Sequence, residues 1–192
     1  HGGLSQMLVD LRAPGVEVRP IEIMGNHAHF AEVTLDGVEV PATMVVGSVG
    51  DGWRQVMSEL AYERSGPERY LSSFPLLAEL LRSGPADGCA AASIGSVAAR
   101  LWALRCLSVR VQSLIDQGHP PAVDAALVKD LGTRLEQEIV DVVRRVVADS
   151  SRDLDPQLTR LLAAAQLSAP AFTLRGGTNE ILRGIIAKGL ET

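Results

Sequence analysis

The sequence predicts a mainly α-helical protein in which a small antiparallel β portion precedes an up-down helical bundle. Apolar residues alternate with a period of two before about residue 50 and recur with a period near 3.6 after it. Hydrophobic residues make up 46% of the 192 residues but aromatic residues only 4%. Such an aliphatic composition suits long helices that pack through Leu, Ala, Val and Ile better than an aromatic-rich β sandwich.

The β portion contains four short segments with strand character. Residues 16–21 and 30–35 alternate apolar and polar side chains, as half-buried strands do. Residues 6–10 are expected to form another strand, and residues 38–40 a fourth, after an Asp-Gly hairpin turn. Because four strands make a marginal sheet with open edges, we expect the chain to begin partway through a β domain.

Helical periodicity starts at Trp53, after a glycine-rich loop. One helix is expected from there, and others over about residues 87–117 and 123–148, from Asp155-Pro156 onward, and from about Thr178 to 189. Asp155 followed by Pro156 is a favourable helix start, and Gly189 is expected to be the glycine that ends the last helix. In the helix over 123–148 the predicted apolar face includes Leu131 and Leu135.

Charge and hydropathy exclude several classes of function. The net charge is −5 and no basic cluster is present, which argues against nucleic-acid binding. No apolar run approaches the roughly 20 residues of a membrane span. The first residues have no signal-peptide layout, and we expect a cytoplasmic protein.

The two cysteines and the histidines predict neither a disulfide nor a metal site. Cys89 and Cys106 lie in apolar helical stretches, so we expect two buried free thiols in a reducing compartment. His27, His29 and His119 show no ligand spacing to either cysteine, and no metal is expected.

Five segments, read in order, resemble the acyl-CoA dehydrogenase family. Each one alone is a weak signal, but the order and the approximate spacing agree with the family over most of the chain. The segments are VDLRAPGVEVRPI at 9–21, FAEVTLDGVEVP at 30–41, GSVGDGW at 47–53, LAYER at 60–64 and GGTNEILRGIIA at 176–187.

The resemblance implies a fold, a reaction and partners. The family fold has an N-terminal helical domain, a middle β barrel and a C-terminal four-helix bundle. Residues 1–50 would then be the C-terminal part of the barrel domain and residues 51–192 the bundle domain. The implied activity is FAD-dependent α,β-dehydrogenation of an acyl-CoA, with an electron-transfer flavoprotein as acceptor and assembly into dimers or tetramers through the bundle. We expect this portion alone to be inactive and to bind FAD poorly.

The reaction requires a carboxylate base that removes the α proton of the thioester. Many family members carry this glutamate directly before the Gly-Thr of the C-terminal motif, but here that position is Gly176. Other members carry the base on the first bundle helix, directly before an arginine. Glu63 and Arg64 match that position, so the resemblance implies that Glu63 is the base. Arg64 is then expected either to orient Glu63 or to hold the site together electrostatically. The alternative is a solvated helical glutamate in an ordinary ion pair.

The C-terminal motif is the expected cofactor-binding segment. Gly176 and Gly177 allow a ligand to approach the backbone closely. Thr178 and Glu180 match family positions that contact the pyrophosphate and ribose region of FAD, and Thr178 is also suited to cap the last helix. The alternative is a turn and a helix cap without a ligand.

Two stretches depart from the family pattern and leave other functions open. Residues 100–105 and 148–151 lack the "R..FG" and "GG" segments that such proteins often carry, and the first of these reaches the flavin of a neighbouring subunit. These departures suit a subunit of a two-gene assembly, so a non-catalytic partner subunit is one alternative. A flavin oxidase or monooxygenase on the same fold is another. The substrate stays open among straight-chain, branched and sterol-derived acyl groups.

Overall fold

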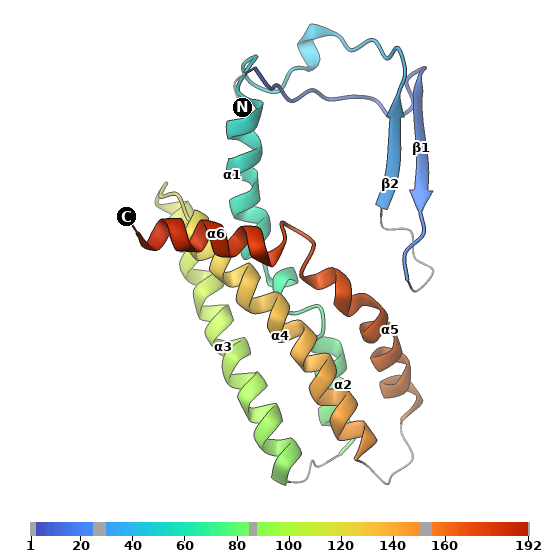
Figure 1. The fold of residues 1–192 in the computed structure, drawn as a ribbon, viewed down its shortest axis with the longest axis vertical. Helices are drawn as coiled ribbons and strands as arrows, with labels where there is room; N and C mark the ends of the chain where they lie inside the picture. The colour runs from blue at the N-terminus through green and yellow to red at the C-terminus, as the bar shows by residue number, and fades with distance from the viewer. Residues whose placement is uncertain (1–2, 25–29, 85–87, 150–154, 192) are drawn as a thin grey trace. The chain divides into compact units, whose positions relative to one another are not determined.

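The computed structural model describes residues 3–24, 30–84, 88–149 and 155–191. Their contacts group the chain into two compact units, His1–Glu59 and Leu60–Thr192. The ribbon in Figure 1 shows two strands in the first unit and a bundle of helices in the second. The domains predicted at 1–50 and 51–192 refer to the whole family fold and stay a prediction.

The first unit contains one two-stranded antiparallel sheet. β1 (Val16–Ile21) pairs with β2 (Phe30–Leu35), with Val16 opposite Leu35 and Ile21 opposite Phe30. Both predicted strands are therefore confirmed. The Asp36 N–H donates to the Gly15 carbonyl at 2.9 Å, and a Cβ at Gly15 would lie only 2.1 Å from Asp36 O. The end of the ladder thus requires a glycine, which also tolerates the φ of +86° found there.

The other two predicted strands are wrong. Residues 6–10 make only an isolated bridge, between Met7 and Val45, next to the short 3₁₀ helix η1 (Ala42–Met44). Residues 38–40 form no strand. Three residues followed by Pro41, which lacks an N–H, offer too few backbone hydrogen bonds to hold a strand, even though Gly37 turns the chain with a φ of +62°.

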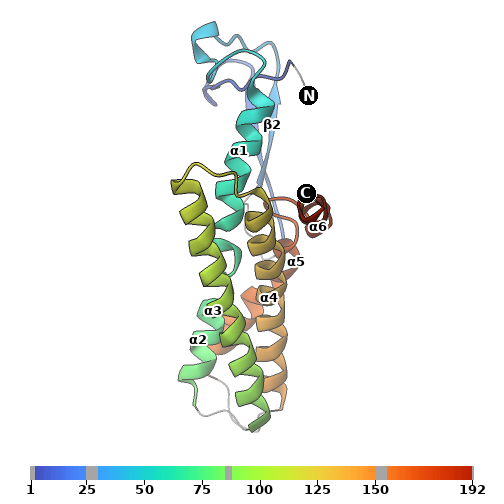
Figure 2. The same cartoon turned by 90° about the vertical axis from the view of Figure 1, so that its left-hand side faces the viewer.

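The second unit is an up-down bundle, as predicted. Figures 1 and 2 show the bundle helices running alongside one another, with α6 lying across one end of α4. The chain enters the unit through α1, which starts in the first unit. The elements are α1 (Gly52–Ser65), the 3₁₀ helix η2 (Pro67–Arg69), α2 (Phe74–Arg82), α3 (Gly88–Asp116), α4 (Ala122–Ala148), α5 (Pro156–Phe172) and α6 (Asn179–Leu190).

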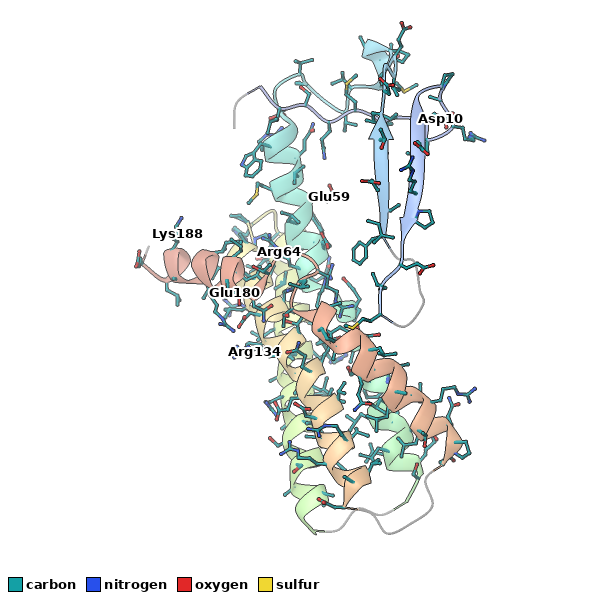
Figure 3. All side chains as sticks on the ribbon, turned by 45° about the vertical axis from the view of Figure 1, so that its right-hand side comes forward. Asp10, Glu59, Arg64, Arg134, Glu180 and Lys188 are labelled. Carbon is teal, nitrogen blue, oxygen red and sulfur yellow. The ribbon has the colours of Figure 1, made fainter. Side chains whose placement is uncertain are left out.

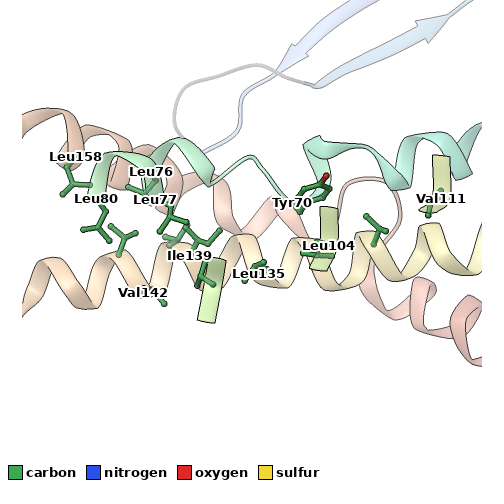
Figure 4. Close-up of a cluster of buried hydrophobic side chains, with 14 of the residues drawn as sticks. Tyr70, Leu76, Leu77, Leu80, Leu104, Val111, Leu135, Ile139, Val142 and Leu158 are labelled. Carbon is green, nitrogen blue, oxygen red and sulfur yellow. The ribbon is translucent and has the colours of Figure 1, made fainter. Parts of the chain in front are cut away.

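Helix α2 was not predicted from the sequence. It has only nine residues, and Pro75 in its first turn obscures the periodicity. A helix this short is not stable by itself and depends on tertiary packing. Leu76, Leu77 and Leu80 supply that packing, because all three are buried in the bundle core. Figure 4 shows these leucines together with Ile139 and Val142 of α4.

The buried face of α4 differs from the predicted apolar face. Leu135 is buried, as expected, but Leu131 is 39% exposed, which corrects the prediction. Lys129, Thr133 and Glu136 are instead fully buried. Burying such groups is costly unless each finds hydrogen-bond or charge partners. Their partners, described below, lie in the loop before α6, at the first residue of α6 and in the segment after η2.

The predicted start of α5 and the predicted end of α6 have different outcomes. The carboxylate of Asp155 accepts the Gln157 N–H at 2.7 Å, which confirms the predicted start of α5. Gly189 does not end α6; it lies inside the helix, where a Cβ would come within 2.2 Å of Val123 Cγ2. Its role is therefore close packing of α6 on α4.

The free thiol of Cys106 is exposed, against the prediction, while the side chain of Cys89 lies outside the described residues. Cys106 follows the buried Leu104 by two residues, which places it about 200° around the helix, on the outer face. None of the described helices is long and apolar enough to cross a membrane.

Candidate functional site

The candidate site surrounds residues 173–178, which we call the glycine loop, between α5 and α6. Gly176 and Gly177 both have positive φ, +66° and +97°. Residues with a side chain rarely adopt this conformation, so two successive glycines are suited to it. A Cβ at Gly176 would lie 3.3 Å from both Glu63 Oε1 and Arg69 Cζ. Both the backbone and the neighbouring side chains thus disfavour a glutamate at 176.

Glu63 projects from the last turns of α1 to this point. Its Oε1 accepts a hydrogen bond of 2.6 Å from Arg69 Nη2, and its carbonyl accepts one of 2.8 Å from Arg69 Nε. Arg69 therefore forms hydrogen bonds with both the backbone and the side chain of Glu63. The arginine side chain is 8% exposed and the glutamate side chain 44%. Among the described residues, none donates a hydrogen bond to Glu63 Oε2.

Arg69 is held in place by the approach of η2 to α4. A Cβ at Gly132 of α4 would lie 2.4 Å from the Arg69 carbonyl oxygen and 3.0 Å from Tyr70 Cβ. The missing side chain lets the two backbones meet. Pro67, at the start of η2, fixes φ for the tight turn that follows Gly66.

Arg64, the residue after Glu63, reaches the glycine loop itself. Its Nε donates to the Gly176 carbonyl at 3.1 Å, and the residue is buried. Burial lowers the pKa of the Arg64 guanidinium, and the neighbouring Glu63 carboxylate opposes that change. Figure 3 labels Arg64 at the end of α1 and Glu180 at the start of α6, the two helix ends that border the loop.

Arg175 ties the glycine loop to α4 and to the segment after η2. Its Nη2 lies within hydrogen-bond distance of three acceptors, Glu136 Oε2 at 2.7 Å, Ser72 Oγ at 2.8 Å and the Glu68 carbonyl at 2.9 Å, which share its two N–H groups. The second oxygen of the fully buried Glu136 accepts the Ser72 N–H at 2.7 Å. The buried carboxylate therefore has both of the partners that it needs.

Lys129 of α4 forms hydrogen bonds with the same loop. Its Nζ donates to the carbonyls of Gly177 at 2.7 Å and Thr173 at 3.3 Å, and to Asn179 Oδ1 at 3.0 Å. Thr133 Oγ1 also lies 3.2 Å from Asn179 Oδ1. Burial lowers the pKa of Lys129 to about 8, and the positive charges of Arg69 and Arg175 add to that effect.

Thr178 and Glu180 open α6 differently from the expected cap. Thr178 is the N-cap residue, but its side chain accepts no backbone N–H, which corrects the capping prediction. The carboxylate of Glu180 instead accepts its own backbone N–H and the Thr178 hydroxyl, and these two hydrogen bonds lower its pKa. The start of α6 thus presents an ionised carboxylate.

The structure brings four of the six predicted site residues into one cluster: Glu63, Arg64, Gly176 and Gly177. Thr178 and Glu180 follow directly in the chain. Sequence reasoning missed the residues that hold this cluster together: Arg69, Lys129, Glu136 and Arg175. One signal was available, because Lys129, Thr133 and Glu136 have the i, i+4, i+7 spacing of a single helix face. The buried Ala125, Val128 and Leu135 lie on the same side of α4.

Comparisons with known proteins identify the family of the chain. The sequence profile of the acyl-CoA dehydrogenase C-terminal domain matches residues 87–191. The chain is 30% identical over 193 residues to acyl-CoA dehydrogenase FadE34 of Mycobacterium tuberculosis, covering 99% of this chain and 26% of that protein. It is 33% identical over 200 residues to acyl-CoA dehydrogenase IpdE1 of Mycolicibacterium smegmatis, covering 98% of this chain and 48% of that protein.

A solved glutaryl-coenzyme A dehydrogenase in complex with glutaryl-CoA has the same fold. The TM-score is 0.83 at 20% identity, over 97% of this chain and 50% of that one. The chain thus spans about a quarter to a half of the curated relatives that it matches. Since the family profile covers more than half of the 192 residues and the helices are arranged as in solved members, this chain belongs to the acyl-CoA dehydrogenase family.

Proposed function

We propose that the protein carrying this chain is an FAD-dependent acyl-CoA dehydrogenase in which Glu63 removes the α proton of the thioester. One observation supports this proposal above all others. The Glu63 carboxylate lies 3.3 Å from the point where a side chain at Gly176 would begin. This proximity supports a base that is supplied from α1 to the surroundings of the glycine loop, in a chain that has no side chain at 176.

The contacts of Glu63 suit proton removal. Arg69 fixes Oε1, while Oε2 has no donor among the described residues and is the oxygen that would accept the proton. When the α C–H bond breaks, its electron pair becomes the second bond between the α and β carbons, and the β hydrogen leaves as hydride. Arg64 and Arg69 keep the carboxylate beside the loop, so that proton transfer needs no further ordering of the base.

FAD would supply the acceptor for that hydride. The residues at the start of α6 fit such a group in part. The two positive-φ glycines leave the backbone open to close approach, and the Thr178 hydroxyl does not cap the helix. The Glu180 carboxylate would repel a phosphate but can accept a hydrogen bond from a hydroxyl. We therefore assign Glu180 to a ribose hydroxyl, and Gly176, Gly177 and Thr178 to the adjoining part of the cofactor.

The Glu63→Gln variant tests the proposal in the complete, flavin-loaded enzyme with an artificial electron acceptor. The amide keeps the shape of the side chain and one acceptor oxygen for Arg69 but cannot take the proton. Loss of a general base is expected to lower kcat by about 10²- to 10⁴-fold. Flavin bleaching by a panel of straight-chain, branched and sterol-derived acyl thioesters would identify the substrate class.

Glu68→Gln is the matched control. Glu68 also lies near Arg69, 3.6 Å from its Nε, but its side chain is exposed on η2. This variant should keep its turnover. If Glu63→Gln keeps full turnover as well, Glu63 is not the base, and a partner subunit without chemistry of its own becomes the better description. If no acyl thioester bleaches the flavin, a same-fold oxidase or monooxygenase is favoured.

The family assignment also supports two proposed partners. We propose an electron-transfer flavoprotein as the electron acceptor and an assembly of two or four subunits through the helical bundle. The outer face of α3 is suited to such an assembly, because Trp102 and Val109 are 65% and 56% exposed there. Sedimentation of the complete enzyme would test the assembly directly, and a monomer at high concentration would contradict it.

A further inference from the structure

We propose that Lys129 is the positioning residue of the glycine loop and that its ammonium group holds Gly176 and Gly177 in the conformation that admits the Glu63 carboxylate. The inference rests on the proposed function of Glu63, but it arises from different contacts. Lys129 lies on α4, is fully buried and touches neither Glu63 nor the surface. It would act through the loop backbone.

The number of contacts matches the protonated side chain. An ammonium has three N–H donors and no acceptor. Three oxygens surround Nζ: those of Gly177 at 2.7 Å, Asn179 at 3.0 Å and Thr173 at 3.3 Å. A neutral amine has only two N–H groups, so its lone pair would have to face one of these oxygens. The arrangement of these three acceptors therefore matches the ammonium form of Lys129, whereas burial disfavours its charge.

The three oxygens mark both ends of the glycine loop. Thr173 begins it, and Gly177 and Asn179 close it onto α6. Arg64 holds the Gly176 carbonyl, and Lys129 holds the next carbonyl, that of Gly177. Two successive glycines have the largest conformational freedom of any residue pair, so these two cations restrict the most mobile part of the loop. Loss of either contact would release the peptide beside Glu63.

The charges around Lys129 explain why its proton is weakly held. Arg64 of α1, Arg69 of η2 and Arg175 of the loop repel it. Asp130 attracts it from α4, but that carboxylate also pairs with Arg134 and with Arg183 of α6. Other acids on these elements also have cationic partners: Glu136 of α4 pairs with Arg175, and Glu63 of α1 and Glu68 of η2 pair with Arg69. Glu180 lies at the start of α6. Together with burial, this balance lowers the pKa of Lys129 to about 8, within the range of an enzyme assay.

The sequence provides an internal reference for a direct test. Lys129 and Lys188 are the two lysines of this chain, and Lys188 is exposed on α6. In the flavin-loaded enzyme with lysine labelled in this chain, NMR would follow both side chains as the pH is raised. We expect Lys129 to titrate near pH 8, well below the ordinary lysine value of 10.5, and the amide signals of Gly177 and Asn179 to move with the same midpoint. A Lys129 midpoint near 10.5, or Gly177 signals that do not follow the titration of Lys129, would overturn the proposal.

Turnover provides the second readout. In Lys129→Met, kcat should fall about 10- to 100-fold while the KM for acyl-CoA stays nearly constant, because the loop and not the substrate loses its support. In the wild type, kcat is expected to decline above about pH 8 as Lys129 loses its proton, and this decline should be absent in Lys129→Met. Lys188→Met should change neither quantity. Unchanged turnover in Lys129→Met would overturn the proposal, and the titration of the wild-type protein decides the matter if this variant does not fold.

The two proposals can fail separately. If Glu63→Gln stays active while Gly177 follows the titration of Lys129, the base is misassigned and the support of the loop stands. If Glu63→Gln is inactive while Gly177 does not respond, the base stands and Lys129 is not the positioning residue.

Discussion

Replacing Gly132 of α4 by alanine is expected to destabilise the protein and to displace Arg69. The added Cβ would lie 2.4 Å from the Arg69 carbonyl oxygen, about 1 Å inside an ordinary contact, and 3.0 Å from Tyr70 Cβ. No rotamer change relieves an overlap between backbones, so η2 must move away from α4. Overpacking of this kind costs about 3 kcal/mol at the upper end of its usual range. Alanine regains about 1 kcal/mol through its higher helix propensity.

The net expectation for Gly132→Ala is a loss of about 2 kcal/mol in the free energy of unfolding, which corresponds to a decrease in Tm of roughly 4–8 °C for a chain of this size. Urea denaturation followed by circular dichroism measures it. Gly95→Ala on α3 is the matched control, since nothing lies within 4 Å of its added Cβ and the exposed helix should gain about 1 kcal/mol. If Gly132→Ala is as stable as Gly95→Ala, the close approach of η2 to α4 is refuted.

Two further predictions concern packing and pH. Leu182→Ala should lower the free energy of unfolding by about 2–5 kcal/mol, because Leu182 is fully buried. Leu190 is 76% exposed on the same helix, so Leu190→Ala should leave this free energy almost unchanged. Equal losses in urea denaturation would contradict the described packing of α6. The pKa of Lys129 is about 8 in the folded protein against 10.5 in the unfolded chain, so between these values the unfolded state binds more protons and stability rises with pH. The stability of the wild type relative to Lys129→Met should therefore increase from pH 8 to pH 10, and a constant difference would show that Lys129 titrates normally.

Local signals in the sequence were sufficient for the long elements and for part of the site. The change of period near residue 50, the Asp155-Pro156 start of α5 and the apolar spacing of α3 each depend on neighbours in the chain, and the structure agrees with all of them. The short elements depend on distant partners. α2 is stabilised by burying its leucines in the bundle, so its local pattern did not predict it. Residues 38–40 pair with no described strand, so their local pattern predicted a strand that does not form.

The sequence by itself determined the family, the helical bundle and the presence of a glutamate at 63 together with a glycine at 176, since these are properties of residue order and periodicity. Only the tertiary structure decided that the end of α1 meets the glycine loop, because Arg64 and Gly176 are 112 positions apart and no local rule spans that distance. It also decided that Lys129 and Glu136 face inward. A charged residue on a helix is ordinarily solvated, and only the carbonyls and the arginine brought to α4 by other segments make its burial favourable.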